Sequence, residues 1–97
     1  MKTDPIAELF SKHDDEYLEF GRVQDKTSQR ADVHAFVLLD KLFPGTPDMV
    51  TAAEHDEIFL WVEPEDLVKT ATEEQIIDLI RCGVRFDTET NSLAMFV

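Results

Sequence analysis

The chain has 97 residues, the size of one domain, and 43% of them are hydrophobic, which is enough to form a folded core. Its net charge of −12, from 9 basic and 21 acidic side chains, disfavours direct binding to nucleic acid or to an anionic membrane. No apolar run approaches the length of a membrane span and no signal peptide is visible, so we expect one cytoplasmic domain over residues 1–97.

The N-terminal segment is predicted to be helical. Asp4 caps a helix well, and Pro5 suits the first helical position. Side chains suited to one buried stripe then recur at helical spacing: Ile6, Leu9, Phe10, His13, Tyr17 and Phe20. We favour one helix to about residue 20, ended by Gly21, over a break between residues 11 and 14.

A polar loop and the most apolar helix are predicted to follow. Residues 22–30 are polar, and we expect their basic side chains to pair with acids of the same chain. Residues 31–43 favour a helix capped by Asp32, with a narrow polar strip that includes His34. Because apolar side chains cover most of its circumference, this helix should be central. The Pro-Gly-Thr-Pro sequence at residues 44–47 ends it.

A β-hairpin is the favoured interpretation of the next stretch. Residues 49–53 favour a strand that pairs with residues 58–62 through a four-residue turn at residues 54–57. A short helix capped by Asp48 is the alternative for the first of these segments. In the second strand, successive side chains point to opposite faces of the sheet. One face carries Ile58, Leu60 and Val62, and the other carries Phe59 and Trp61.

The C-terminal third is predicted to contain two short helices and a closing hairpin. Pro64 suits the start of the first helix. Thr72 and Gln75 have the spacing of a capping box for the second, and Gly83 suits a left-handed end. The closing strands are residues 84–86 and 93–97.

Together these elements predict an α+β fold. N-terminal helices pack with a small antiparallel sheet of three or four strands, in the order α-α-β-β-α-α-β-β. The helices should cover the face that carries Ile58, Leu60, Val62, Val84, Phe86, Leu93, Met95 and Val97. The opposite face then carries Phe59, Trp61, Ala94 and Phe96 and needs a cover, which the first helix, a second copy or a partner protein could supply.

The sequence carries no catalytic signature. Cys82 is the single cysteine, so an intrachain disulfide is excluded, and its place beside a buried stripe indicates an unreactive thiol. His13 and His55 are flanked by acids, and imidazole with carboxylates can bind zinc, manganese or iron. Neither cluster has the i, i+4 spacing of a helical metal pair. The serines lie in no motif that would supply a catalytic base, and the three glycines form no phosphate-binding loop. We therefore expect that the protein is not an enzyme and binds no cofactor.

We therefore expect a small acidic module that acts through protein–protein contacts. The predicted interface combines the aromatic residues Phe59, Trp61 and Phe96 with the acids Glu54, Asp56 and Glu57. Its partner would be a basic, nucleic-acid-binding protein that the module inhibits or adapts, in the manner of a phage or mobile-element decoy. A homodimer through the aromatic face is a further expectation. The alternative function is a metal-binding or small catalytic domain that uses His13, His55 and nearby acids.

Overall fold

The computed structural model describes residues 5–96, which form an α+β fold. Four α-helices and a four-stranded antiparallel sheet, with two 3-10 turns, make up this part of the chain. In chain order the elements are α1 (Pro5–Lys12), η1 (Asp14–Glu16), η2 (Phe20–Arg22), α2 (Ala31–Leu42), β1 (Val50–Glu54), β2 (Glu57–Leu60), α3 (Pro64–Thr70), α4 (Glu73–Arg81), β3 (Arg85–Asp87) and β4 (Ser92–Phe96). The predicted fold class and element order are confirmed.

The sheet has the strand order β1-β2-β4-β3, with β1 and β3 at its edges. The hairpin interpretation of residues 49–53 is confirmed, although its turn has two residues, because Glu54 pairs with Glu57. His55, the first residue of that turn, has φ +57°, a left-handed conformation typical of tight hairpin turns. The β2–β4 register, with Ile58 opposite Met95 and Phe59 opposite Ala94, gives the predicted division between the two faces.

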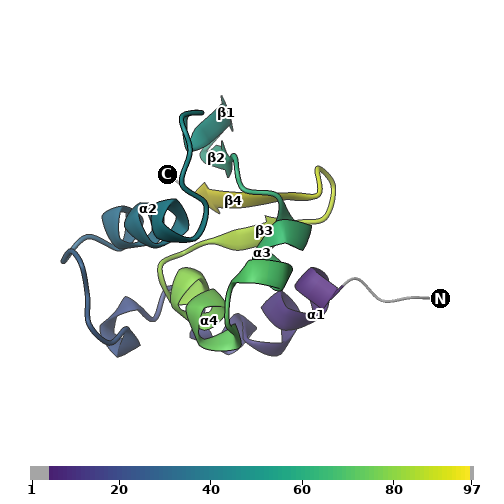
Figure 1. Ribbon diagram of the computed structural model, residues 1–97. Helices are drawn as coiled ribbons and strands as arrows, with labels where there is room; N and C mark the ends of the chain where they lie inside the picture. The colour runs from purple at the N-terminus through teal and green to yellow at the C-terminus, as the bar shows by residue number, and fades with distance from the viewer. Residues whose placement is uncertain (1–4, 97) are drawn as a thin grey trace.

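The inner face of the sheet packs on helices. Figure 1 shows α1, α3 and α4 together on one side of β3 and β4. Leu79 of α4 and Leu93 of β4 are fully buried in the shared core, together with Leu67 of α3. The rings of Phe10 and Phe86 lie 6.4 Å apart and join α1 to β3. This helical layer therefore fixes the residues of α1 and α4 that lie next to β3.

The prediction of one N-terminal helix to residue 20 is wrong, and the alternative break is the observed one. α1 ends at Lys12, and the chain continues as the turns η1 and η2. Leu18 between them has φ +64°, which no continuous helix allows. Its backbone N–H instead donates to the Ile80 carbonyl of α4 at 3.2 Å. The predicted Asp4 cap lies outside the described residues.

The helix at residues 31–43 is present as α2, but two details of its prediction are wrong. Asp32 is not the cap: Arg30 occupies that position, and the Asp32 carboxylate accepts a bond from the neighbouring Val33 N–H at 2.9 Å. His34 does not face solvent but is buried, with 6% of its surface exposed. Its Nδ1 accepts from the Thr27 N–H at 3.2 Å, so the polar loop before α2 satisfies it.

The strand predicted at residues 58–62 is shorter than expected. β2 ends at Leu60, and Trp61 lies in a bend. The Trp61 N–H still donates to the Met49 carbonyl at 2.7 Å, so pairing continues one residue beyond the regular strand. A Cβ on Gly45 would lie 3.2 Å from the Trp61 ring, which places the indole against the loop that follows α2. Trp61 therefore packs inside this chain rather than extending the aromatic sheet face.

The capping box of α4 is present in full. The Gln75 N–H donates to the Thr72 hydroxyl at 3.1 Å, and the Thr72 N–H donates to the Gln75 side chain at 2.8 Å. Gly83, with φ +100°, provides the predicted left-handed residue just after the helix.

Replacing Thr72 by Ala should lower the free energy of unfolding by about 1 kcal/mol, because an N-terminal N–H of α4 loses its acceptor. Urea titration followed by circular dichroism measures this loss. Thr70→Ala is the matched control, since the structure gives the exposed Thr70 hydroxyl no hydrogen bond. Equal losses in the two variants would contradict the capping role.

Candidate functional site

Four of the six residues predicted to form an interface lie on one face of the sheet. Glu54 is opposite Glu57 in the β1–β2 pairing, and Glu57 is opposite Phe96 in the β2–β4 pairing. Directly opposite side chains share a face, and Phe59 is two residues along the same strand. We call this surface the outer face, and it consists of Ala52, Glu54, Glu57, Phe59, Arg85, Ala94 and Phe96.

An ion pair and an exposed aromatic ring dominate the outer face. The Arg85 guanidinium binds the Glu57 carboxylate and also lies 4.4 Å from the centre of the Phe96 ring. Phe96 nevertheless leaves 59% of its surface exposed. Because Glu57 is directly opposite Glu54, Arg85 compensates a like-charge contact across the hairpin. The outer face thus presents one exposed aromatic ring, Phe96, and the exposed carboxylate of Glu54, with Glu57 between them.

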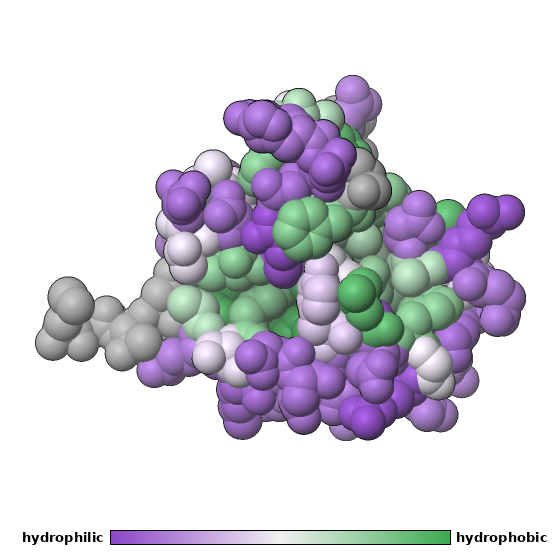
Figure 2. Space-filling view, turned by 180° about the vertical axis from the view of Figure 1, so that it is seen from behind, coloured by the Kyte–Doolittle hydropathy of each residue, from purple (hydrophilic) through white to green (hydrophobic). Residues whose placement is uncertain are grey.

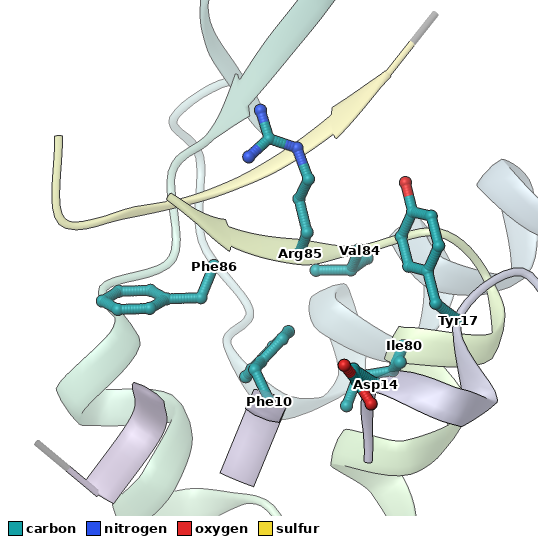
Figure 3. A pocket seen from close by; sticks show the side chains of 7 residues that line it. All are labelled: Phe10, Asp14, Tyr17, Ile80, Val84, Arg85 and Phe86. Carbon is teal, nitrogen blue, oxygen red and sulfur yellow. The ribbon is translucent and has the colours of Figure 1, made fainter. Parts of the chain in front are cut away.

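A hollow lies at the free edge of β3, next to the outer face. It has a volume of about 380 Å³ and is lined by Phe10, Asp14, Tyr17, Ile80, Val84, Arg85 and Phe86. Figure 3 shows that these side chains come from α1, from η1 and the residue after it, from α4, and from β3 and the residue before it. Most of the lining is apolar, and Asp14 supplies its carboxylate. Arg85 belongs to both surfaces and links them.

An exposed leucine stands beside the hollow. Leu18 leaves 62% of its surface exposed, although its φ is positive, which is unfavourable for a leucine. A Cβ built on Gly83 would be 3.0 Å from its side chain, so Leu18 is next to the segment that leads into Val84. Figure 2 shows apolar side chains gathered in the middle of one side of the molecule, between hydrophilic bands. An apolar side chain held in strain at the surface is a candidate contact residue.

Ion pairs hold η1 in place beside α4. The Arg81 Nε donates to Glu16 Oε1 at 3.0 Å, and an Arg22 nitrogen donates to the same oxygen at 2.9 Å. These two guanidinium groups, with the Arg81 hydrogen bond first, lower the pKa of Glu16 below its usual value. Glu16 is therefore a fixed anion at neutral pH. Asp14, the first residue of η1, and Tyr17, the residue after η1, both line the hollow, and this anchor holds the turn that carries them.

The other predicted interface residues lie elsewhere or contribute less. Asp56 is exposed in the β1–β2 turn, and Phe59 is half-buried. Trp61 is half-buried against the loop that contains Gly45. The structure adds Phe10, Tyr17 and Phe86, which the sequence pattern assigned to the core. Their helical and strand spacing was the only available signal, and it does not distinguish a buried wall from the lining of an open hollow.

The two acid-flanked histidines have different neighbours. The His13 Nε2 lies 2.6 Å from the Glu73 carboxylate at the start of α4, and Lys12 binds the same carboxylate at 3.1 Å. His55 lies in the exposed β1–β2 turn next to Glu54. Within residues 5–96, no group of three or more His, Cys, Asp or Glu side chains is arranged to hold a metal ion. Cys82 is buried, and burial raises the pKa of its thiol to about 12, which makes it a poor nucleophile.

Comparison of the chain with protein-family models, with curated proteins and with solved structures found no match. In the part of the chain that the structure describes, no helix has both the length and the apolar character needed to cross a bilayer.

Proposed function

We propose that this protein is a non-enzymatic module that docks on a basic, nucleic-acid-binding protein and occupies the surface that would otherwise bind nucleic acid. The observation that carries the proposal is the combination of an exposed aromatic ring, Phe96, with a surface of strong negative charge. The ring would anchor the complex, and the acids would select a cationic partner. In this proposal the module inhibits or adapts its partner in the manner of a phage or mobile-element decoy.

The charge distribution supports a cationic partner. Among the described acids, all but Glu16, Glu57, Asp78 and Asp87 are exposed. Exposed acids produce a field that extends about 8–10 Å from the surface at physiological salt. Such a field raises the rate of encounter with a positive surface and suppresses contact with an acidic one.

Two exposed apolar side chains supply the expected anchors. Phe96 on the outer face and Leu18 beside the hollow are each more than half exposed, at 59% and 62%. A few large side chains supply most of the binding free energy at a protein interface. Aromatic residues are enriched among them, whereas leucine is under-represented. We therefore expect Phe96 to contribute more to binding than Leu18.

The test is affinity capture with the full chain, followed by measurements on the purified partner. We expect a basic nucleic-acid-binding protein whose affinity falls at least about tenfold between about 50 and 300 mM salt. Duplex DNA should compete with the module for that protein. Retained proteins that are acidic, or binding that salt does not weaken, would overturn the proposal.

Phe96→Ala tests the anchor without changing the charge. Binding to the captured partner should weaken by about tenfold or more. Val33→Ala is the matched control, because Val33 is an exposed apolar residue on α2, outside the outer face and the hollow. Light scattering on both variants is part of the experiment. A dimer that Phe96→Ala abolishes would assign the outer face to a second copy instead of a different protein.

A further inference from the structure

We infer that the hollow beside β3 binds an arginine side chain of the partner. This inference rests on the proposed function and makes it more specific, because it names the group that enters one particular cavity. It follows from the size of the hollow, from its lining and from the balance of charge within it.

The size and lining of the hollow suit one long side chain. Its volume of about 380 Å³ is near the lower end of the range for small-molecule pockets, which is roughly 300–1,000 Å³. Three aromatic rings, those of Phe10, Tyr17 and Phe86, contribute to the lining. The aliphatic stem of an arginine can lie along apolar walls while its guanidinium stacks on an aromatic face.

The charge in the hollow is uncompensated. Asp14 and Arg85 are its two ionisable groups that are charged at neutral pH. The Arg85 guanidinium binds Glu57 and Phe96, and Figure 3 shows it pointing past β4, away from Asp14. The structure gives the Asp14 carboxylate no hydrogen bond or ion pair within residues 5–96. The hollow therefore offers a free anion beside aromatic rings, and this combination favours a cation.

Arginine fits the site better than lysine does. Its planar guanidinium can bind a carboxylate through two parallel hydrogen bonds and can also stack on a ring. The ammonium of lysine is a compact and strongly hydrated charge, so it would lose more hydration on entering this apolar lining. Arginine-rich surfaces are also typical of proteins that bind nucleic acid, which agrees with the proposed partner.

The backbone that carries Asp14 is held in position before any ligand arrives. Asp14 is the first residue of η1, and its carbonyl accepts the Tyr17 N–H at 3.2 Å. Two residues further on, Glu16 is fixed by Arg81 and Arg22. Because this backbone is already fixed, only the Asp14 side chain must be ordered on binding, and less of the interaction free energy is lost as conformational entropy.

The experiment uses a defined probe, the capped peptide Gly-Gly-Arg-Gly-Gly, in NMR titrations of the full chain. We expect a dissociation constant on the order of 1 mM, which is weak because one side chain makes the contact. Chemical shifts should change at Phe10, Tyr17, Ile80, Val84 and Phe86. The same peptide with citrulline, which is neutral and similar in shape, should bind at least about tenfold more weakly.

Asp14→Asn and Asp15→Asn are a matched pair for this test. Both variants remove one negative charge from adjacent exposed residues, but only Asp14 lines the hollow. We expect Asp14→Asn to weaken the arginine peptide by about tenfold and Asp15→Asn to leave it within about twofold. Equal effects would show that general acidity, not the hollow, attracts the peptide, and would overturn the inference. Chemical-shift changes spread over the whole surface of the wild-type protein would overturn the inference as well. That result does not depend on whether the variants fold.

Failure here is distinguishable from failure of the proposed function. If Asp14→Asn binds the captured partner as tightly as Asp15→Asn does, while salt still weakens both complexes, the arginine site is wrong and the docking proposal stands. If no basic partner is captured but the peptide still distinguishes the two variants, the arginine site stands and the docking proposal is wrong.

Discussion

Replacing Leu79 by Ala is expected to lower the free energy of unfolding by about 2–5 kcal/mol. Leu79 lies in the last turn of α4 with 0% of its surface exposed, in the core shared with the inner face of the sheet. Truncation removes methyl groups from a close-packed interior and leaves a cavity that the rigid layer of α1, α3 and α4 can fill only in part. Since a domain of this size has a stability of about 5–15 kcal/mol, one such change removes a large fraction of it.

Urea denaturation monitored by far-UV circular dichroism measures this effect. Leu18→Ala is the matched control, because it deletes the same atoms from a side chain that is 62% exposed. We expect that variant to lose less than about 1 kcal/mol. If the two variants lost similar free energy, α4 would not be the centre of the core.

Local signals in the sequence were sufficient for the second half of the fold. α4 has a complete capping box at Thr72 and Gln75 and a left-handed residue at Gly83. Each of these signals depends on residues within a few positions of one another, so it can be identified without knowledge of the tertiary structure. The strict alternation along β2 likewise predicted which side chains of the sheet share a face, as the register with β4 confirms.

The first half was less predictable because contacts distant in sequence determine it. The break after α1 depends on a bond from the Leu18 N–H to the Ile80 carbonyl and on the pairing of Glu16 with Arg81, 65 positions away. Helical periodicity continues through this break, so it favoured a single helix. The burial of His34 also depends on a tertiary arrangement, because the loop before α2 folds back to satisfy its ring nitrogen.

The candidate site follows the same division. The part of the outer face formed by Phe59, Ala94 and Phe96 could be predicted, because side chains alternate along neighbouring strands, whereas Glu54 and Glu57 were assigned to the hairpin turn. The hollow could not, because α1, η1, α4 and β3 each contribute only one or two of its residues. Phe10 and Phe86 are 76 positions apart, and only the packing of α1 on β3 brings their rings within 6.4 Å. A site assembled in this way has no local sequence signal.

Replacing Gly83 by Ala is expected to lower the free energy of unfolding by about 1–2 kcal/mol or more, for two separable reasons. The first is the backbone: Gly83 has φ +100°, outside the region that residues with a side chain adopt readily. The second is space: an added Cβ would be 3.0 Å from Leu18 Cδ2, tighter than most Cβ contacts in proteins, so the leucine side chain would have to shift by a few tenths of an ångström. Gly21→Ala is the control, because nothing lies within 4 Å of a Cβ at that position.

A double-mutant cycle with Leu18→Ala separates the two reasons. In the Leu18→Ala background the added methyl no longer meets the leucine side chain, so the loss caused by Gly83→Ala should shrink by the steric part. The backbone part should remain, because truncating Leu18 does not alter the φ that the turn after α4 requires at residue 83. Equal losses in both backgrounds would mean that the leucine moves aside freely. A loss no larger than that of Gly21→Ala would contradict the left-handed end of α4, and with it the geometry that places Leu18 beside the hollow.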